Sequence, residues 1–193
     1  MAAAIRAHRS GVMRVIAGQF KGRRLKAPSW EGLRPTSDKL RETLFNILAP
    51  RIAGASVLDG FAGTGALGVE AMSRGAAHVT FIEHDRRAAA LIESNLALCG
   101  AKRGYTIECG DVASVLRRTR GDAACDLVLL DPPYDIDHDM LIQVLEVAAS
   151  RVTADGLLVL ERASWRECGV PGVLSRVRDV MSGDSALTLF CRV

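Results

Sequence analysis

Short apolar runs that end in an acidic residue recur along the chain from residue 55 onward. Runs of this length, bounded by turn signals, predict strands that are buried on both faces of a sheet. We expect such strands over residues 55–59, 77–83, 105–109, 127–130 and 156–161. The segments between them have helical patterns, which end at about residues 74, 98, 120 and 150. This alternation predicts an α/β fold with a mostly parallel sheet.

The carboxyl-terminal end of the chain has a different pattern. Two β-rich runs, residues 173–180 and 186–193, are separated by the turn-forming sequence Ser-Gly-Asp-Ser at 182–185. A turn of this kind between β-forming runs predicts an antiparallel hairpin at the sheet edge. We therefore expect a Rossmann-like, seven-stranded, mostly parallel sheet with helices on both faces and a C-terminal antiparallel hairpin strand.

The amino-terminal end mixes β-forming residues, glycine and many cations. Around Gly18 and Gly22 this mixture predicts a basic β-hairpin or arm. Residues 37–48 follow, with apolar side chains at helical spacing after a Ser/Thr cap, and predict an amphipathic helix. We expect three parts: a flexible extension over residues 1–12, a basic β-hairpin arm over 13–35 and one domain over 36–193.

Net charge is distributed unevenly along the chain. Residues 1–41 hold ten Lys or Arg against two acids, a net charge of +8; the whole chain has +3, so residues 42–193 carry −5. This asymmetry indicates that the amino-terminal part faces a polyanion such as nucleic acid, although a solvated cationic edge strand has the same composition. The candidate nucleic-acid contacts are Arg14, Lys21, Arg23, Arg24, Lys26, Arg34, Thr36 and Arg41.

The overall composition is that of a soluble globular protein, with 24% charged and 49% apolar residues. No run approaches the roughly 18 apolar residues of a membrane span. Five cysteines without Cys-x-x-Cys spacing favour neither a disulfide framework nor a zinc ribbon, and four scattered histidines lack metal-ligand spacing. We expect reduced thiols, no metal and a cytoplasmic location.

The sequence Asp131-Pro132-Pro133-Tyr134 ends the apolar run over residues 127–130 abruptly. Proline supplies no ladder donor, so the strand must end at Asp131, which places an acid at the carboxyl end of a buried strand. Ligands of open α/β sheets bind at that edge, and Tyr134 offers a flat ring that can stack on another ring. A strand-ending turn with a surface tyrosine would have the same four residues, so the segment alone does not decide between the two.

A glycine-rich loop follows the first predicted strand. Its Gly63-x-Gly65-x-x-Gly68 spacing matches the dinucleotide fingerprint, and Glu83 ends the next strand 18 positions beyond Gly65. This unit predicts a nucleoside-binding site and is compatible with NAD. Asp59, directly before the loop, is poorly placed for a pyrophosphate but suits the ammonium and sulfonium groups of S-adenosylmethionine.

With S-adenosylmethionine bound, Glu83 would accept hydrogen bonds from the ribose hydroxyls. Asp111, after the third strand, would receive the adenine amino group or cap the helix that follows it. The candidate cofactor residues are Asp59, Phe61, Ala62, Gly63, Thr64, Gly65, Glu83, Asp111 and Val112.

Several motifs together resemble a known family. Asp59-x-Phe61-x-Gly63-x-Gly65, followed by Asp-Pro-Pro-Tyr at 131–134, is similar to the Rossmann-like class I S-adenosylmethionine-dependent methyltransferases that act on exocyclic amines of nucleobases. The segments 13–25, 33–46 and 61–71 narrow the resemblance to the bacterial 16S ribosomal RNA guanine-N2 methyltransferases that modify guanine 966. The likeness extends over residues 13–193, is weakest in the carboxyl-terminal hairpin and excludes residues 1–12.

The resemblance implies a role for each residue of the tetrapeptide. Asp131 and the backbone carbonyl of Pro132 would accept the amino hydrogens of the guanine, Pro133 would stiffen the backbone, and Tyr134 would stack on the base. The implied partner is 16S ribosomal RNA within an assembled or assembling small subunit, and we expect a monomer without membrane contact.

Other functions stay open at this point. An adenine-N6 DNA or RNA methyltransferase can have the same tetrapeptide, and an NAD-linked oxidoreductase can have the same glycine loop. A non-catalytic RNA-binding protein with a relic cofactor pocket is a further alternative. The tetrapeptide does not distinguish guanine from adenine, and the choice of guanine follows from the resemblance elsewhere in the chain.

Overall fold

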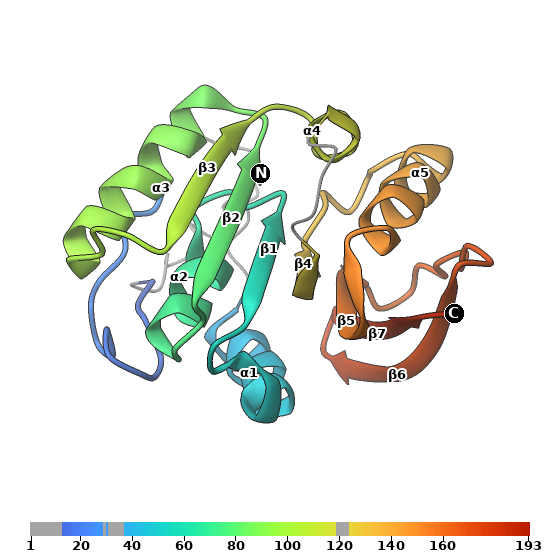
Figure 1. Cartoon of the computed structure of the whole chain (residues 1–193), viewed down its shortest axis with the longest axis horizontal. Helices are drawn as coiled ribbons and strands as arrows, with labels where there is room; N and C mark the ends of the chain where they lie inside the picture. Colours follow the sequence, from blue (N-terminus) through green and yellow to red (C-terminus); the bar gives the residue numbers. More distant parts are fainter. Residues whose placement is uncertain (1–12, 29, 31–36, 119–123) are drawn as a thin grey trace, which may run out of the picture.

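A seven-stranded sheet forms the centre of the structure, a computed structural model that describes residues 13–28, 30, 37–118 and 124–193. The strand order is β3-β2-β1-β4-β5-β7-β6, and neighbours are parallel except in the two pairs that contain β7 (Figure 1). The order reverses between β1 and β4, a position at which open α/β sheets bind ligands. The strands are β1 (Ser56–Gly60), β2 (His78–Glu83), β3 (Tyr105–Cys109), β4 (Cys125–Leu130), β5 (Val152–Ala163), β6 (Leu174–Ser182) and β7 (Ser185–Arg192).

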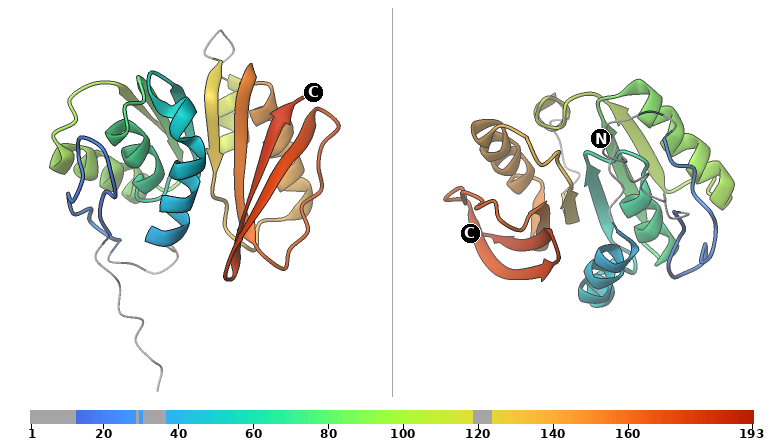
Figure 2. Two further views of the ribbon diagram at one scale, coloured as in Figure 1. Left: turned by 90° about the horizontal axis from the view of Figure 1, so that it is seen from below. Right: turned by 180° about the vertical axis from the view of Figure 1, so that it is seen from behind.

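Helices in the described residues cover both faces of the sheet (Figure 2). One face packs against α1, α2 and α3, and the other packs against α4 and α5. Nowhere in residues 13–28, 30, 37–118 and 124–193 is a helix long and apolar enough to cross a membrane. The helices are α1 (Asp38–Ile52), α2 (Ala66–Ser73), α3 (Arg86–Cys99), α4 (Val112–Arg118) and α5 (His138–Ala149).

Side chains that alternate along the strands divide the core into two layers. In β1, Val57 packs in the layer shared with α1 to α3, whereas its neighbour Leu58 packs in the layer shared with α4 and α5. In β4, Leu127 and Val128 divide in the same way. Successive side chains of a strand point to opposite faces, so a sheet covered on both sides requires apolar residues at every position of its central strands.

The predicted architecture is confirmed; most elements begin or end a residue or two from the predicted limits, and β5 and α1 differ most. The carboxyl-terminal hairpin forms, with β7 antiparallel to β5 and β6 at the edge. Strand β5 begins at Val152, earlier than predicted, because residues that look like a turn pair irregularly with β4 where the register shifts between Cys125 and Leu127. Helix α1 continues to Ile52 with Pro50 in its last turn.

The arm returns on itself as predicted, but residues 13–28, the continuous part of it that the structure describes, form no long strands. A single antiparallel bridge joins Arg14 to Arg24, and backbone hydrogen bonds join Val15 to Arg23 and Leu25 to Met13. Met13, Val15 and Leu25 of the arm are buried in the same core layer as α1, α2 and α3, and Phe20 packs partly buried against it. The arm therefore packs on the domain as an irregular hairpin, and most of its structure depends on these tertiary contacts.

Candidate functional site

Three carboxylates converge at the carboxyl edge of the central strands. Asp59 lies one residue before the end of β1, Glu83 ends β2, and Asp131 directly follows β4. The last residues of β1 and β4, Gly60 and Leu130, pair with each other, so these strand ends are in register. Burial raises the pKa of Asp59 well above its usual range, and the charges of Asp131 and Glu83 raise it further. The edge is thus an electronegative site next to the switch point of the sheet.

Glu83 organises the backbone around it. Its side chain is buried; Oε2 accepts a hydrogen bond from the Gly63 amide at 2.8 Å, and Oε1 accepts one from the Asp85 amide at 2.8 Å. His84 Nδ1 lies 3.0 Å from the same Oε1. An ionised carboxylate has about four acceptor positions, so these contacts leave capacity for a further donor such as a hydroxyl.

Asp59 holds the beginning of α2 against the sheet. Its Oδ2 accepts a hydrogen bond from the Gly68 amide at 2.8 Å, one of the amides at a helix start that have no partner within the helix. A Cβ at Gly68 would lie 2.2 Å from Phe81 Cε1, so the helix sits too close to the sheet for any side chain there. Asp59 therefore has a structural role beside the predicted role as a cofactor ligand, which stays a prediction.

The loop between β1 and α2 has an unusual backbone. Phe61 has a φ of 60°, and Gly63 and Gly65 have φ values of 55° and 76°. A bulky residue in the left-handed region is strained, and such strain concentrates at ligand sites. The Ala62 amide donates to the Ile82 carbonyl at 3.0 Å, which ties the strained segment to β2. The predicted cofactor loop is thus held in one conformation by the sheet.

The other predicted cofactor residues flank this loop. Thr64 is buried, and its carbonyl accepts a hydrogen bond from Asn95 Nδ2 at 2.9 Å. Asp111 Oδ1 accepts one from the Ser114 amide at 2.8 Å, so Asp111 caps the beginning of α4, one of the two roles predicted for it. Val112, the next residue, is buried in the core layer of α4 and α5. A contact between Asp111 and adenine stays a prediction.

The Asp-Pro-Pro-Tyr segment directly follows β4. The Asp131 amide donates to the Gly60 carbonyl at 3.4 Å, which continues the contact between β4 and β1. Pro132 is buried and Pro133 is exposed. The Pro133 carbonyl accepts a hydrogen bond from the Ile136 amide at 3.0 Å; within the described chain no such bond to the Pro132 carbonyl is present. The segment therefore presents a carboxylate and a carbonyl at the same edge of the sheet.

Tyr134 is fixed at both its hydroxyl and its backbone. The hydroxyl lies 2.6 Å from Ser185 Oγ and donates to Glu161 Oε1 at 3.5 Å. The guanidinium of Arg166 donates to the Tyr134 carbonyl. The ring meets the ring of Trp165 edge to face, with centroids 6.2 Å apart and planes at 85°. These contacts tie the tetrapeptide to β5, to the loop after β5 and to the start of β7.

A buried glutamate anchors the arm. Glu70 in α2 accepts hydrogen bonds from the Ile16 amide at 2.7 Å and the Ala17 amide at 3.0 Å, and it pairs with Arg74 Nε at 2.7 Å. Because these amides are satisfied by a side chain of the domain, they need no ladder partner in the arm. This explains why the arm is an irregular hairpin.

The residues predicted to contact nucleic acid fall into three groups. The first group is exposed on the arm and comprises Arg14, Lys21, Arg23, Arg24 and Lys26. Arg23 Nη1 also donates to the Leu98 carbonyl at 3.3 Å, which holds this residue against the end of α3. The second group, Arg34 and Thr36, lies outside the described residues.

The structure corrects the prediction for Arg41, the third group. Its side chain has no exposed surface; Nη2 donates to the Arg14 carbonyl at 2.6 Å and to Asp38 Oδ1 at 2.8 Å. Burial lowers the pKa of its guanidinium, an effect that Asp38 and Glu70 oppose. Packing of the arm over α1 thus removes Arg41 from the surface, and it joins the arm to the helix in place of contacting phosphate.

Two residues near the site were not predicted. Glu70 stands out in the sequence as an acid inside an apolar helix, a pattern that indicates a buried charge with specific partners. Trp165, 69% exposed in the loop after β5, belongs to no periodic pattern. Its only sequence signal is an aromatic residue shortly after a strand that ends in an acid.

The chain is similar to several known proteins. The model of the family described as conserved hypothetical protein 95 matches residues 13–191. Ribosomal RNA small subunit methyltransferase D of Escherichia coli strain K12 is 44% identical over 125 residues, which are 65% of this chain and 62% of the relative. The protein of the same name from Haemophilus influenzae is 43% identical over 126 residues, 64% of this chain and 65% of the relative. The matched region therefore spans less than two thirds of these relatives.

A solved structure extends the likeness to nearly the whole chain. A hypothetical protein of Thermus thermophilus superposes with a TM-score of 0.77 at 30% identity, and the match covers 94% of this chain and 100% of that one.

Proposed function

The chain belongs to the conserved hypothetical protein 95 family, and on this basis we propose that it transfers a methyl group from S-adenosylmethionine to the exocyclic N2 amine of a guanine in 16S ribosomal RNA. The observation that carries the proposal is the position of Asp131-Pro-Pro-Tyr at the end of β4, beside the carboxylates that end β1 and β2. The names of the curated relatives support the class of substrate.

The residues at the carboxyl edge fit S-adenosylmethionine. This group supplies an electrophilic methyl carbon on a sulfonium, and it also carries an ammonium group. Asp59 and Glu83 place two buried carboxyl groups at this edge, which favours a cationic ligand over a pyrophosphate. The strained loop from Phe61 to Gly65 brings backbone close to that position. In this proposal Glu83 accepts hydrogen bonds from the ribose hydroxyls, and Asp111 accepts one from the adenine amino group.

The tetrapeptide orients the guanine. The lone pair of its exocyclic nitrogen is delocalised into the ring, so catalysis must turn this nitrogen toward the methyl carbon and hold both partners close. Asp131 and the Pro132 carbonyl accept the two amino hydrogens, which favours a pyramidal nitrogen. The ring of Tyr134 stacks on the base. As the new nitrogen to carbon bond forms, the bond between carbon and sulfur breaks, and the nitrogen becomes strongly acidic.

Asp131 takes the proton that this nitrogen releases, directly or through a water molecule. A strongly acidic donor needs no base of raised pKa, so an ordinary carboxylate suffices. Asp131 is half-buried at the sheet edge, which leaves a route for the proton to solvent.

The exposed cations of the arm supply the contact with RNA. Arg14, Lys21, Arg24 and Lys26 are exposed on one short segment, and phosphate contacts of this kind give affinity and position without reading the sequence. The target base must leave its stack to reach Asp131. The cations of the arm assist this step because they hold the phosphates that flank the target. We propose an assembled or assembling small subunit as the substrate, the cytoplasm as the location and a monomeric enzyme.

A transfer assay tests this function. Small ribosomal subunits purified from a strain without the gene are incubated with the protein and radiolabelled S-adenosylmethionine, and the RNA is digested to nucleosides. We expect label in N2-methylguanosine. Label in N6-methyladenosine would show that the target base is adenine and not guanine. Calorimetric binding of NAD, with no binding of S-adenosylmethionine, would overturn the proposal in favour of an oxidoreductase.

A further inference from the structure

We propose that Trp165 is a second nucleobase-stacking residue, which binds a nucleotide flanking the target guanine while Tyr134 stacks on the target itself. This inference rests on the proposed function, because it assigns Tyr134 to the target base. It adds a subsite for an unpaired nucleobase on the loop after β5.

Trp165 lies on the same edge of the sheet as the tetrapeptide. The loop leaves β5 at Ala163, whose partner in β7 is Ser185, the residue that contacts the Tyr134 hydroxyl. The centroids of the Trp165 and Tyr134 rings are 6.2 Å apart. A base on Tyr134 and a base on Trp165 would therefore occupy adjacent positions along one RNA strand.

The angle between the rings suits a nucleotide that has left its stack. The planes of Trp165 and Tyr134 are at 85°, so bases stacked on the two rings would also lie nearly perpendicular. Neighbouring bases in a helix are parallel, whereas a base rotated into an active site is turned out of the plane of its neighbours. The two rings thus match the conformation that methyl transfer to an exocyclic amine requires.

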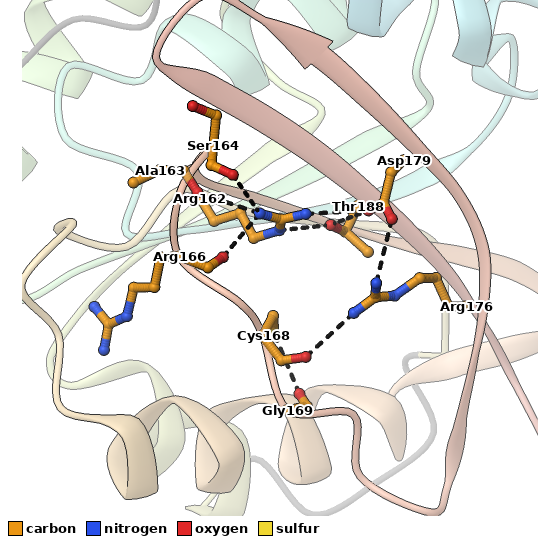
Figure 3. A network of polar contacts seen from close by, with 9 residues as sticks. All are labelled: Arg162, Ala163, Ser164, Arg166, Cys168, Gly169, Arg176, Asp179 and Thr188. Atoms are coloured by element: carbon orange, nitrogen blue, oxygen red, sulfur yellow. Dashed lines mark hydrogen bonds and ion pairs between the residues drawn. The ribbon is translucent and has the colours of Figure 1, made fainter.

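Trp165 is exposed but its backbone is firmly held. Figure 3 shows the guanidinium of Arg162 among the carbonyl oxygens of the loop, with Nη1 at 3.2 Å from that of Ala163, 3.5 Å from that of Ser164 and 2.8 Å from that of Arg166. The Ser164 amide donates to the Asp184 carbonyl at 2.8 Å. Residues on both sides of Trp165 are therefore fixed, while 69% of its own surface faces solvent.

Side chains of the hairpin hold Arg162 in turn. Its Nε donates to Thr188 Oγ1 at 3.0 Å, its Nη2 lies 3.4 Å from Asp179 Oδ1, and Asp179 also pairs with Arg176 (Figure 3). On the other side, the Arg166 guanidinium donates to the carbonyls of Tyr134 and Ile136. The hairpin, the loop and the tetrapeptide form one connected network, so the position of Trp165 relative to Tyr134 is set before any ligand binds.

A nucleobase is the ligand that these features favour. Every base has a face that stacks on an aromatic ring, and a preorganised ring loses little entropy on binding. A protein partner is the other class of ligand, and a fluorescence titration with RNA distinguishes it from a nucleobase.

The first test compares steady-state kinetics of the full chain on small subunits that lack the modification. Stacking on one base contributes enough affinity that Trp165→Leu should raise KM for the subunits about tenfold, with kcat within about twofold and unchanged affinity for S-adenosylmethionine. Trp165→Phe retains an aromatic face and should restore most of the KM. Met181→Leu is the matched control, because Met181 is similarly exposed, at 59%, on the edge strand β6.

The second test detects stacking directly. The chain has two tryptophans, so Trp30→Phe leaves Trp165 as the single fluorophore. Titration with a single-stranded RNA pentamer, one guanosine between adenosines, should quench the fluorescence of this variant with saturation. An unchanged KM in Trp165→Leu would overturn the proposal. A raised KM without fluorescence quenching would also overturn it, in favour of a protein contact.

The two proposals fail in different ways. If the wild-type chain transfers no methyl group to ribosomal RNA, the proposed function fails. The fluorescence titration and the RNA affinities of wild-type and Trp165→Leu proteins then still decide whether Trp165 binds a nucleobase, because neither measurement requires turnover.

Discussion

The hydroxyl of Tyr134 lies 2.6 Å from the hydroxyl of Ser185, so the last residue of the tetrapeptide is linked to the first residue of β7. Tyr134→Phe removes this link and the longer contact of the hydroxyl with Glu161 Oε1, at 3.5 Å, but keeps the ring. Since a neutral hydrogen bond contributes about 0.5–1.5 kcal/mol, we expect kcat/KM for ribosomal subunits to fall by about tenfold at most. Tyr134→Ala removes the ring and should lower kcat/KM much further. Equal losses in both variants would show that the hydroxyl, and not the ring, is needed.

Asp59 should make stability depend on pH. Burial raises its pKa in the folded protein above the ordinary value of 3.8, with Asp131 and Glu83 adding to the effect and the Gly68 amide opposing it. Because the folded protein binds the Asp59 proton more tightly than the unfolded chain does, this proton stabilises the folded state. The stabilisation is complete at pH values below the pKa that Asp59 has in the unfolded chain. This stabilisation is lost as pH rises from about 4 through the folded-state pKa, by up to about 1.4 kcal/mol per pH unit.

Asp59→Asn should flatten this dependence while keeping an acceptor for the Gly68 amide. Urea denaturation of wild-type and variant proteins between about pH 4 and pH 7 measures it. The matched control is Asp155→Asn, a change at an exposed position where the side chain makes no hydrogen bond in the described structure. Parallel curves for wild type and Asp59→Asn would show that Asp59 does not titrate as its burial requires.

Gly68→Ala should destabilise the fold and weaken cofactor binding. The added Cβ would lie 2.2 Å from Phe81 Cε1 and 2.9 Å from Asp59 Oδ2, so α2 must move away from the sheet. Overpacking of this kind costs about 1–3 kcal/mol, which corresponds to a fall in Tm of roughly 2–12 °C. Gly172→Ala is the control, because nothing lies within 4 Å of its Cβ, and its Tm should be unchanged. Calorimetry should show weaker S-adenosylmethionine binding in Gly68→Ala only.

The arm should supply phosphate contacts through Arg23 and Arg24. Replacing both by alanine should weaken RNA binding at low salt and reduce the slope of log affinity against log salt by about 1–2. Arg24→Ala alone avoids the loss of the bond from Arg23 to the Leu98 carbonyl. Arg51→Ala is the control, since Arg51 contacts the Asp155 carbonyl beside the beginning of β5, away from the carboxyl edge. An unchanged salt slope in the double variant would leave the arm as a solvated cationic surface.

The sequence predicts the sheet and its functional edge because both depend on local patterns. Apolar runs that end in Asp59, Glu83 and Asp131 define strands and place acids at their carboxyl ends, and proline fixes the end of β4. The register that brings the three acids together follows from parallel pairing of neighbouring strands. These features required no knowledge of distant contacts.

What the sequence did not predict depends on contacts between distant segments. Arg41 has the pattern of a surface cation on an amphipathic helix, and only the packing of the arm over α1 buries it. The arm itself forms one bridge because Glu70, more than fifty residues away, binds its amides. Trp165 lies in an irregular loop, and its position beside Tyr134 comes from the tertiary network around Arg162.

Asp131 is the residue on which the proposed chemistry depends, so its replacement tests the central claim most directly. A strain that lacks the gene is complemented with wild-type protein or with Asp131→Ala, and nucleosides from the 16S ribosomal RNA are measured by mass spectrometry. We predict that wild-type protein restores N2-methylguanosine at the target nucleotide and that Asp131→Ala does not, although the purified variant still binds S-adenosylmethionine in a calorimeter. N2-methylguanosine that is unchanged by deletion of the gene, or is fully restored by Asp131→Ala, would contradict the account.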